Sequence, residues 1–339
     1  MPPPPSSRLL RALHVILLAA RFTSLAILVL WCTFAIFWSS LPGIFLRGSL
    51  AAAFAVLSPT IALRCRKRLT PELTSLAVAL PVIVGWSLIA ASNDRAWSPD
   101  QIVLPRADIW DEGVRLRGMR DFAYAPDGAF TARYADEKYR FADLETVYFV
   151  VEPYSAWHAV AHTFLTFGFR DGRHVAISVE IRKERGEHYD PVNGLFKQYE
   201  IMYVIGTERD LIGLRANIRK DEVYLYTIRA SREKIRELFL DMLYRSNALA
   251  VRPEFYNTLT NACTTNLARH VNAVVPHQVP LSLKVLLPGY ADNLAYDLGL
   301  IDTDEPFEVF RARCRINEAA EGAQDARDFS ARIRKGRPR

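Results

Sequence analysis

The stretch HTFLTFGFRDGRHVAISVEIR, residues 162–182, predicts two strands joined by a tight turn. Residues 162–169 and 174–182 are rich in β-branched and aromatic side chains, which favour strands. The turn Arg170-Asp171-Gly172 ends on glycine, which suits a three-residue hairpin loop with a bulge. We therefore expect an antiparallel hairpin at the centre of a sheet.

The face pattern of this hairpin fixes its register. The apolar residues of the two strands share one face when a three-residue loop places Phe169 opposite Arg173. Counting back along the ladder then pairs His162 with Glu180, and directly opposite residues have Cβ atoms about 5 Å apart. The apolar face packs into the core and the other face presents His162 beside Glu180. A two-residue loop would instead pair His162 with Ile181.

Composition and periodicity also predict further strands and two helices. Ser231 is a candidate N-cap for an amphipathic helix, and a second helix begins near Cys263 and ends before Pro276. These patterns predict an α+β domain. The further strands are expected at residues 147–152, 200–205 and 223–229.

Apolar residues concentrate before residue 92, in three runs at 22–41, 44–63 and 73–91. Each run is close to the ~20 residues that cross a bilayer core, so three N-terminal transmembrane helices are expected. A cleavable signal peptide is the alternative for the first run. Arg8, Arg11 and the basic residues at 64–68 mark the cytoplasmic side, which leaves the rest of the chain on the far side.

The chain is therefore expected to have four parts. These are a membrane anchor at 1–92, a connecting segment at 93–145, a catalytic domain at 146–301 and a polar C-terminal extension at 302–339.

Composition argues against several classes of function. The 339 residues carry a formal net charge of +6, which is modest and includes the cytoplasmic basic loop. No basic stripe with interleaved aromatic residues is present, so nucleic-acid binding is not expected. The four cysteines form no CxxC pair or metal-ligand cluster, so neither a zinc site nor a disulfide framework is expected. The thiol chemistry considered below needs no metal or organic cofactor.

The segment NACTTN, residues 261–266, places a cysteine at a helix start. Helix-terminal N–H groups favour the thiolate and can hold an oxyanion, so Cys263 is a candidate nucleophile. Its base would be His162, with Glu180 orienting the imidazole, as in thiol and serine triads. The alternatives are a buried structural cysteine beside a hairpin ion pair, or a disulfide between Cys263 and Cys314.

Three segments of the chain resemble the Lnb-type periplasmic domain family. They are WHAVAHTF at 157–164, ISVEIRKE at 177–184 and FYNTLTNACTTN at 255–266, and the resemblance covers roughly residues 100–335. Members of that family are similar to circularly permuted NlpC/P60, papain-like thiol enzymes, in which histidine precedes cysteine in the sequence. Ala262 departs from the family, where a second asparagine is expected.

The family takes its name from an alternative apolipoprotein N-acyltransferase of bacteria. The resemblance therefore implies a multi-pass inner-membrane enzyme with a papain-like domain in the periplasm. It would transfer an acyl chain from a phospholipid, through a thioester on Cys263, to the N-terminal amine of an apolipoprotein. The rivals are a cysteine amidase or peptidase of the NlpC/P60 type, and a membrane-anchored binding domain with a degenerate site.

Other polar residues are candidates for binding the substrate. Arg182 shares a strand face with Glu180, so it contacts either a lipid phosphate or Glu180 itself. Tyr256, Asn257 and Asn261 are expected to line the site. Asn261 is also the alternative to Glu180 as the orienting residue, and His158 is the alternative to His162 as the base.

Overall fold

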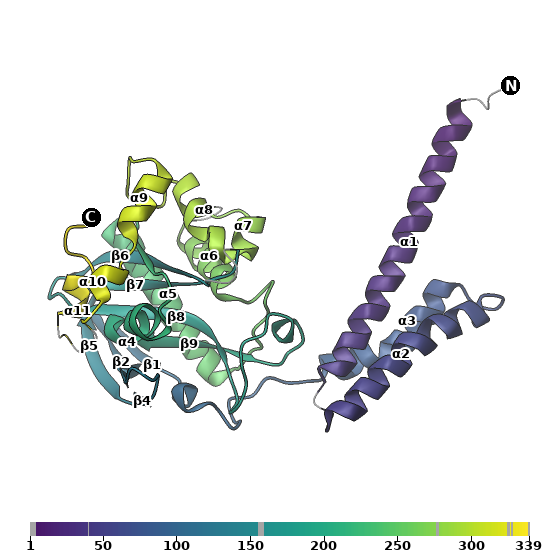
Figure 1. Ribbon diagram of the computed structural model, residues 1–339, viewed down its shortest axis with the longest axis horizontal. Helices are drawn as coiled ribbons and strands as arrows, with labels where there is room; N and C mark the ends of the chain where they lie inside the picture. Colours follow the sequence, from purple (N-terminus) through teal and green to yellow (C-terminus); the bar gives the residue numbers. More distant parts are fainter. Residues whose placement is uncertain are drawn as a thin grey trace. The chain divides into compact units, whose positions relative to one another are not determined.

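The computed structural model describes residues 5–39, 41–154, 159–275, 278–323, 326 and 328–337. The chain divides into two compact units (Figure 1). One unit is Met1–Ala90 with Phe196–Gln198, and the other is Ala91–Leu195 with Tyr199–Arg339. Each unit is described by itself.

The first unit contains three helices, α1 (Pro5–Phe37), α2 (Ile44–Cys65) and α3 (Pro71–Ser87). Only α1, from Leu9, and α2 are long and apolar enough to cross a membrane among the described residues. The expected third transmembrane helix falls short of that length. Helix α3 has 17 residues and is about 25 Å long, whereas a bilayer core is about 30 Å thick. The difference arises because the helix ends at Ser87, before the apolar run does.

The three helices of the first unit are joined by specific contacts. Arg21 on α1 forms an ion pair with Glu72 in the first turn of α3. Further along both helices, the rings of Trp31 and Trp86 pack edge to face with centroids 5.1 Å apart. Because both contacts follow the same order along each helix, α1 and α3 run in the same direction.

An eight-stranded sheet forms the centre of the second unit. The strand order is β1-β2-β9-β8-β7-β6-β10, and β5 also pairs with β2. All of the pairs are antiparallel except that of β2 with β9. The strands are β1 (Arg106–Trp110), β2 (Gly113–Arg120), β5 (Tyr134–Arg140), β6 (Leu144–Pro153), β7 (Ala161–Phe169), β8 (His174–Arg182), β9 (Glu200–Gly206) and β10 (Tyr224–Thr227). A separate ladder pairs β3 (Ala123–Tyr124) with β4 (Phe130–Thr131).

The β7–β8 hairpin has the predicted register. The loop is closed by a hydrogen bond from Phe169 N–H to the carbonyl of Arg173, at 2.9 Å, and Phe164 lies opposite Ser178. Gly172 has φ 84°, a left-handed conformation that few other residues adopt without strain. The local turn chemistry therefore fixes which side chains of the hairpin share a face.

One face of the sheet packs against α5 (Arg232–Val251) and α6 (Cys263–Val274). Both helices begin where the sequence predicts. Ser231 Oγ accepts a hydrogen bond from Lys234 N–H at the start of α5, and Cys263 is the first residue of α6. The core on this face includes Leu165 and Phe167 of β7, Ile177 and Val179 of β8, Phe239 and Leu243 of α5, and Leu267 of α6.

The opposite face is also buried, although the sequence suggested a polar face there. It is covered by α4 (Glu208–Gly213), the π-helix η4 (Leu214–Arg219), α10 (Asn317–Ala320) and α11 (Phe329–Arg332) (Figure 1). Ile316 and Ile333 are fully buried in this second core, so residues that follow 302 form part of the fold. Residues 93–145 likewise supply β1, β2 and β5. The structure therefore does not set the connecting segment or the C-terminal extension apart from the catalytic segment.

Seven short helices complete the described part of the second unit. Four follow α6, namely α7 (Leu283–Leu286), η5 (Pro288–Tyr290), α8 (Ala291–Asp297) and α9 (Phe307–Cys314). The other three are the 3-10 helices η1 (Pro99–Gln101), η2 (Phe141–Asp143) and η3 (Asn193–Leu195).

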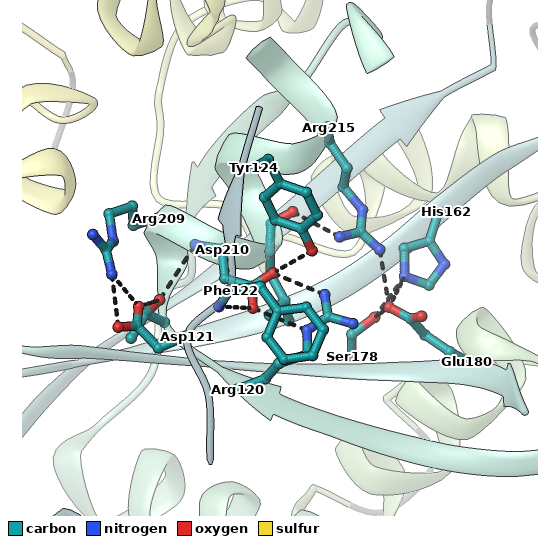
Figure 2. A network of polar contacts seen from close by, with 12 residues as sticks. Arg120, Asp121, Phe122, Tyr124, His162, Ser178, Glu180, Arg209, Asp210 and Arg215 are labelled. Carbon is teal, nitrogen blue, oxygen red and sulfur yellow. Dashed lines mark hydrogen bonds and ion pairs between the residues drawn. The ribbon is translucent and has the colours of Figure 1, made fainter. Parts of the chain in front are cut away.

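A buried carboxylate ties α4 to the segment that follows β2. Asp210 is fully buried and accepts two hydrogen bonds from Arg120, at 2.9 and 3.0 Å. It also accepts from the backbone N–H of Phe122 at 2.8 Å and the hydroxyl of Tyr124 at 2.9 Å (Figure 2). Every oxygen lone pair that faces the core has a donor, which is what a buried charge needs.

We expect Asp210→Ala to lower the free energy of unfolding by about 3–5 kcal/mol, because the change leaves the buried Arg120 without its counter-charge. The measurement is chemical or thermal unfolding of the detergent-solubilised full chain. Asp108→Ala is the matched control, since the Arg117–Asp108 pair is half exposed and should contribute about 0–1 kcal/mol. Equal losses in the two variants would contradict this account of the fold.

Candidate active site

His162 and Glu180 lie on one face of the hairpin and are linked through Ser178 (Figure 2). Ser178 donates its hydroxyl to Glu180 Oε1 at 2.9 Å, because a carboxylate can only accept. The Ser178 oxygen, 2.6 Å from His162 Nε2, must then accept the Nε2 proton. The Nδ1 lone pair of His162 is left available, and no described residue donates a hydrogen bond to it.

The sequence correctly predicted that His162 lies beside Glu180, but it missed the bridging hydroxyl. Nε2 of His162 is 3.9 Å from Glu180 Oε1, too far for a direct hydrogen bond. Ser178 could have been found, since it precedes Glu180 by two residues and therefore shares its strand face.

Arg215, on η4, supplies the counter-charge for this cluster. It donates to Glu180 Oε1 at 3.0 Å and to Glu152 Oε2 at 2.6 Å, and its guanidinium lies over the ring of Phe164. No sequence signal pointed to Arg215, because it reaches the hairpin from an irregular helix that covers the second face.

Charge and burial together hold the imidazole neutral. Burial, followed by the positive charge of Arg215, lowers the pKa of His162 to about 3. Burial acts to raise the pKa of Glu180, but the attraction of Arg215 outweighs it and holds that pKa below its usual value. At neutral pH the cluster therefore presents an uncharged imidazole with a free Nδ1 lone pair, a form that can accept a proton.

Cys263 lies at the N-terminus of α6, next to β7. Its Sγ is 3.7 Å from the hydroxyl of Thr264, and that hydroxyl is 3.3 Å from the hydroxyl of Thr163. The residues that directly follow Cys263 and His162 thus touch each other. Within the described part of the chain, no hydrogen bond joins Cys263 to His162, because the His162 side chain lies with Ser178 and Glu180 on the opposite face of the hairpin from α6. Cys263 and Cys314 are free thiols, so the disulfide alternative is not formed.

Three tyrosines from separate segments lie near Cys263. Burial raises the pKa of Tyr256, Tyr154 and Tyr189, and the nearby Cys263 thiol adds to the rise in each case. The rings of Tyr189 and Tyr256 pack edge to face, with centroids 6.5 Å apart. All three phenols stay protonated at neutral pH and can donate hydrogen bonds. The sequence predicted that Tyr256 lines the site. No spacing in the sequence connects Tyr154 or Tyr189 with it.

Arg182 lies apart from this cluster. It is buried and donates to the carbonyls of Gln101 and Ile102 and to the side chain of Asn93, and it stacks on Trp97. Its guanidinium therefore holds the segment at 93–102 against β8. The structure records neither a contact with Glu180 nor an open position for a lipid phosphate at this side chain.

Asn257 and Asn261 shape the turn that leads into α6. Asn257 Oδ1 accepts hydrogen bonds from the N–H groups of Leu259 and Thr260, at 3.1 and 3.0 Å. Asn261 donates to the carbonyl of Phe255 at 2.8 Å. Both amides thus fix the path of the chain just before Cys263. The alternative base, His158, lies outside the described residues.

An apolar cavity of about 320 Å³ runs beside α6. Such a volume, with mostly aliphatic walls, is typical of a small-molecule site. The wall nearest Cys263 is formed by Thr264. The cavity is lined by Val147, Phe149, Leu165, Ile228, Arg229, Ala230, Ser231, Lys234, Leu238, Thr264, Leu267, Ala268, Val271, Val274, Val275, Val279, Val285, Ala291, Leu294, Ala295, Leu298 and Leu300.

Residues 130–289 match the family model of the Lnb N-terminal periplasmic domain. This part of the chain is an Lnb N-terminal periplasmic domain. The resemblance seen in the sequence is thereby confirmed, and the matched segment contains His162, Glu180 and Cys263. No curated protein and no solved structure matches the chain. With the apolar helices α1 and α2 before it, the Lnb domain belongs to a membrane-anchored protein.

We expect thiol reagents to separate the two cysteines of the Lnb-containing unit. Burial raises the pKa of the Cys314 thiol to about 12, so alkylation of Cys314 should be negligible at pH 8. Cys263, at a helix N-terminus, should react with iodoacetamide under the same conditions. Peptide mass spectrometry of the native protein measures both, and the denatured protein serves as the control. Faster alkylation of Cys314 than of Cys263 would rule out Cys263 as the reactive thiol.

Proposed function

We propose that this protein is a membrane-anchored thiol acyltransferase that moves an acyl chain from a phospholipid to the N-terminal amine of lipoproteins. The observation that carries the proposal is that a single helix, α6, has Cys263 at its N-terminus and an apolar cavity along its side. The nucleophile and a place for an acyl chain thus lie on one rigid element. The family match and the membrane helices support a substrate drawn from the bilayer.

In the first step, Cys263 Sγ attacks the ester carbonyl while His162 Nδ1 takes the thiol proton. The C–O bond then breaks, and His162 returns the proton to the leaving alkoxide of the lysophospholipid. Since Nε2 of His162 already donates to Ser178, the Nδ1 lone pair is the position that takes the proton, and the imidazole works as a general base. His162 shares one face of the hairpin with Ser178 and Glu180, whereas α6 packs on the other face. This step therefore requires the start of β7 or of α6 to rearrange when substrate binds, until Sγ and Nδ1 are within hydrogen-bond distance.

In the second step, the amine of the acceptor attacks the thioester carbonyl. His162 takes a proton from the amine, the C–S bond breaks, and the thiol is re-formed with that proton. The amide product then leaves. No metal or organic cofactor takes part in either step.

The oxyanion of both steps would be held at the N-terminus of α6. The first N–H groups of a helix have no partner within it, and they point toward a charge placed at that end. The N–H of Ala262 is already bonded to Thr265 Oγ1 at 2.8 Å, so the donors are the N–H groups from Cys263 onward. Tyr154 and Tyr256 are additional donors beside the thiol.

The order of the two groups along the chain supports a permuted papain-like arrangement. A strand carries the histidine and a later helix carries the cysteine at its first residue. A cysteine amidase or peptidase would use the same groups. The aliphatic cavity beside Cys263 favours the acyl-transfer reading, since a peptide or cell-wall substrate would need polar partners there.

We expect full-length protein incubated with phospholipid, without an amine acceptor, to gain the mass of one acyl chain on Cys263. Hydroxylamine should release the adduct, as it does a thioester. Cys263→Ala should give no adduct. His162→Ala should slow its formation by about 10²–10⁴-fold, as for loss of a general base. His174→Ala, at the turn end of the same hairpin, is the control. Full acyl transfer by Cys263→Ala would refute the mechanism.

The proposed topology needs α3 to cross as well, although α3 by itself is shorter than a bilayer core, and the direction of α3 supports such a crossing. Since α1 and α3 run the same way, a crossing by α3 and the apolar residues 88–91 that follow it carries the Lnb domain to the side reached by α1. Three crossings then place the basic segment at 64–68 in the cytoplasm and the domain in the periplasm. A multi-pass anchor in the bacterial inner membrane is therefore part of the proposal.

We expect a reporter fused after Arg339 to be active only in the periplasm, because three crossings separate it from the cytoplasmic N-terminus. A reporter fused after Arg68 should be active only in the cytoplasm, and it serves as the internal control. If both reporters were active in the cytoplasm, α3 would not cross the membrane.

A further inference from the structure

The segment from Leu281 to Tyr290 exposes an unusual amount of apolar surface. Leu281 is 89% exposed and Leu283 is 73% exposed, more than any other leucine described in the second unit. Leu287 and Tyr290 are exposed as well. A cluster of exposed apolar side chains in a short segment is typical of a surface that meets another apolar phase.

The same segment forms one wall of the cavity beside α6. Val285, in the middle of α7, is only 4% exposed and lines the cavity, whereas Leu283 and Leu287 face solvent. Helix α7 is therefore apolar on both sides and separates the cavity from the surface. It also lies close to the hairpin, because Gly289 N–H donates to the carbonyl of Ala159 at 3.1 Å, two residues before β7.

We propose that the segment 281–290 docks into the acyl-chain region of a phospholipid bilayer, and that the cavity behind it receives one acyl chain from that bilayer. The role of this chain as substrate rests on the proposed function, whereas the docking stands by itself. The occupant is a lipid because the chain carries its own candidate membrane helices, α1 and α2, and only residues 66–90 separate α2 from the domain that begins at Ala91.

The length of the cavity agrees with a lipid acyl chain as its occupant. The α6 residues that line the cavity run from Thr264 to Val274, a rise of about 15 Å. One leaflet of a bilayer core about 30 Å thick has the same depth. Thr264 is the lining residue of α6 nearest the start of the helix, and its hydroxyl is 3.7 Å from Cys263 Sγ. The carboxyl end of a chain lying along α6 would therefore reach the thiol.

The side chains at the ends of the segment fit an interfacial position. Tyr290 has an apolar ring with a polar tip, and such side chains favour the boundary between headgroups and acyl chains. Lys284, on the same helix, is held by Asp297 and Asn293, so its charge is neutralised within the domain. The exposed leucines thus carry no unpaired charge into the bilayer with them.

The test is photolabelling of the full-length protein carrying Cys263→Ser, which removes the chemistry and leaves binding. The protein is reconstituted in phosphatidylethanolamine–phosphatidylglycerol vesicles that contain a phosphatidylethanolamine with a diazirine on one acyl chain. After illumination, peptide mass spectrometry maps the labels. We expect labels on α6 and on residues 279–298, in addition to α1 and α2, which report the reconstitution.

Substituting both Leu281→Ser and Leu283→Ser should lower the labelling of α6 by about tenfold and leave α1 and α2 unchanged. Val251→Ser is the matched control, since Val251 is 77% exposed but lies at the end of α5, outside the cavity. Ala268→Phe, which fills the cavity from α6, should abolish the labels on α8 and spare those on Leu281 and Leu283. Melting curves confirm that each variant is folded.

Three results would overturn the inference. They are labels on α6 no stronger than those around Val251, equal labelling in the double-leucine variant, and crosslinks from 281–290 to another protein chain instead of lipid. A wild-type thioester without cavity labels would defeat this inference and leave the proposed function standing. Cavity labels without any thioester in the wild type would defeat the proposed function and leave the docking standing.

Discussion

The β7–β8 hairpin is buried on both faces, and alternate residues along it serve two different cores. Leu165, Phe167 and Ile177 pack against α5 and α6. Phe164 and Ala176 pack against α4 and its neighbours on the other face. A carboxylate on the second face, such as Glu180, can be buried only with a counter-charge, and Arg215 supplies it. Burial, and after it the positive charge of the same arginine, keep the imidazole of His162 neutral.

Burial of both faces also explains how the sheet holds Cys263. Helix α6 packs on the first face through Leu267, and the hydroxyls of Thr163 and Thr264 meet between β7 and the first turn. At the far side of α6, His270 bridges Asp241 of α5 and Tyr203 of β9. The helix is therefore fixed at its first turn and again near its middle, so the thiol and the apolar cavity keep a constant relation to each other.

The sequence predicted the features that depend on residues close together in the chain, and it missed those that depend on residues far apart. The hairpin register and the start of α6 followed from loop length, face alternation and capping, which act within a few residues. Arg215 and Tyr189 were missed, because they reach the site from segments whose packing is set by the whole fold. Arg182 shows the reverse case. The strand face of Arg182 was predicted correctly, but its hydrogen-bond partners come from residues 93–102. No local sequence pattern predicts those contacts.

In the proposed mechanism, helix α6 holds the nucleophile and the acyl chain together. The most direct measurement is an experimental structure of the full-length protein alkylated by 2-bromopalmitate, in which a thiolate displaces bromide and leaves a long chain on the sulfur. We expect Cys263 to carry the adduct and its chain to lie between α6, β7 and α8, in contact with Leu267 and Leu294. An unmodified Cys263, or a chain that lies outside this cavity, would contradict it.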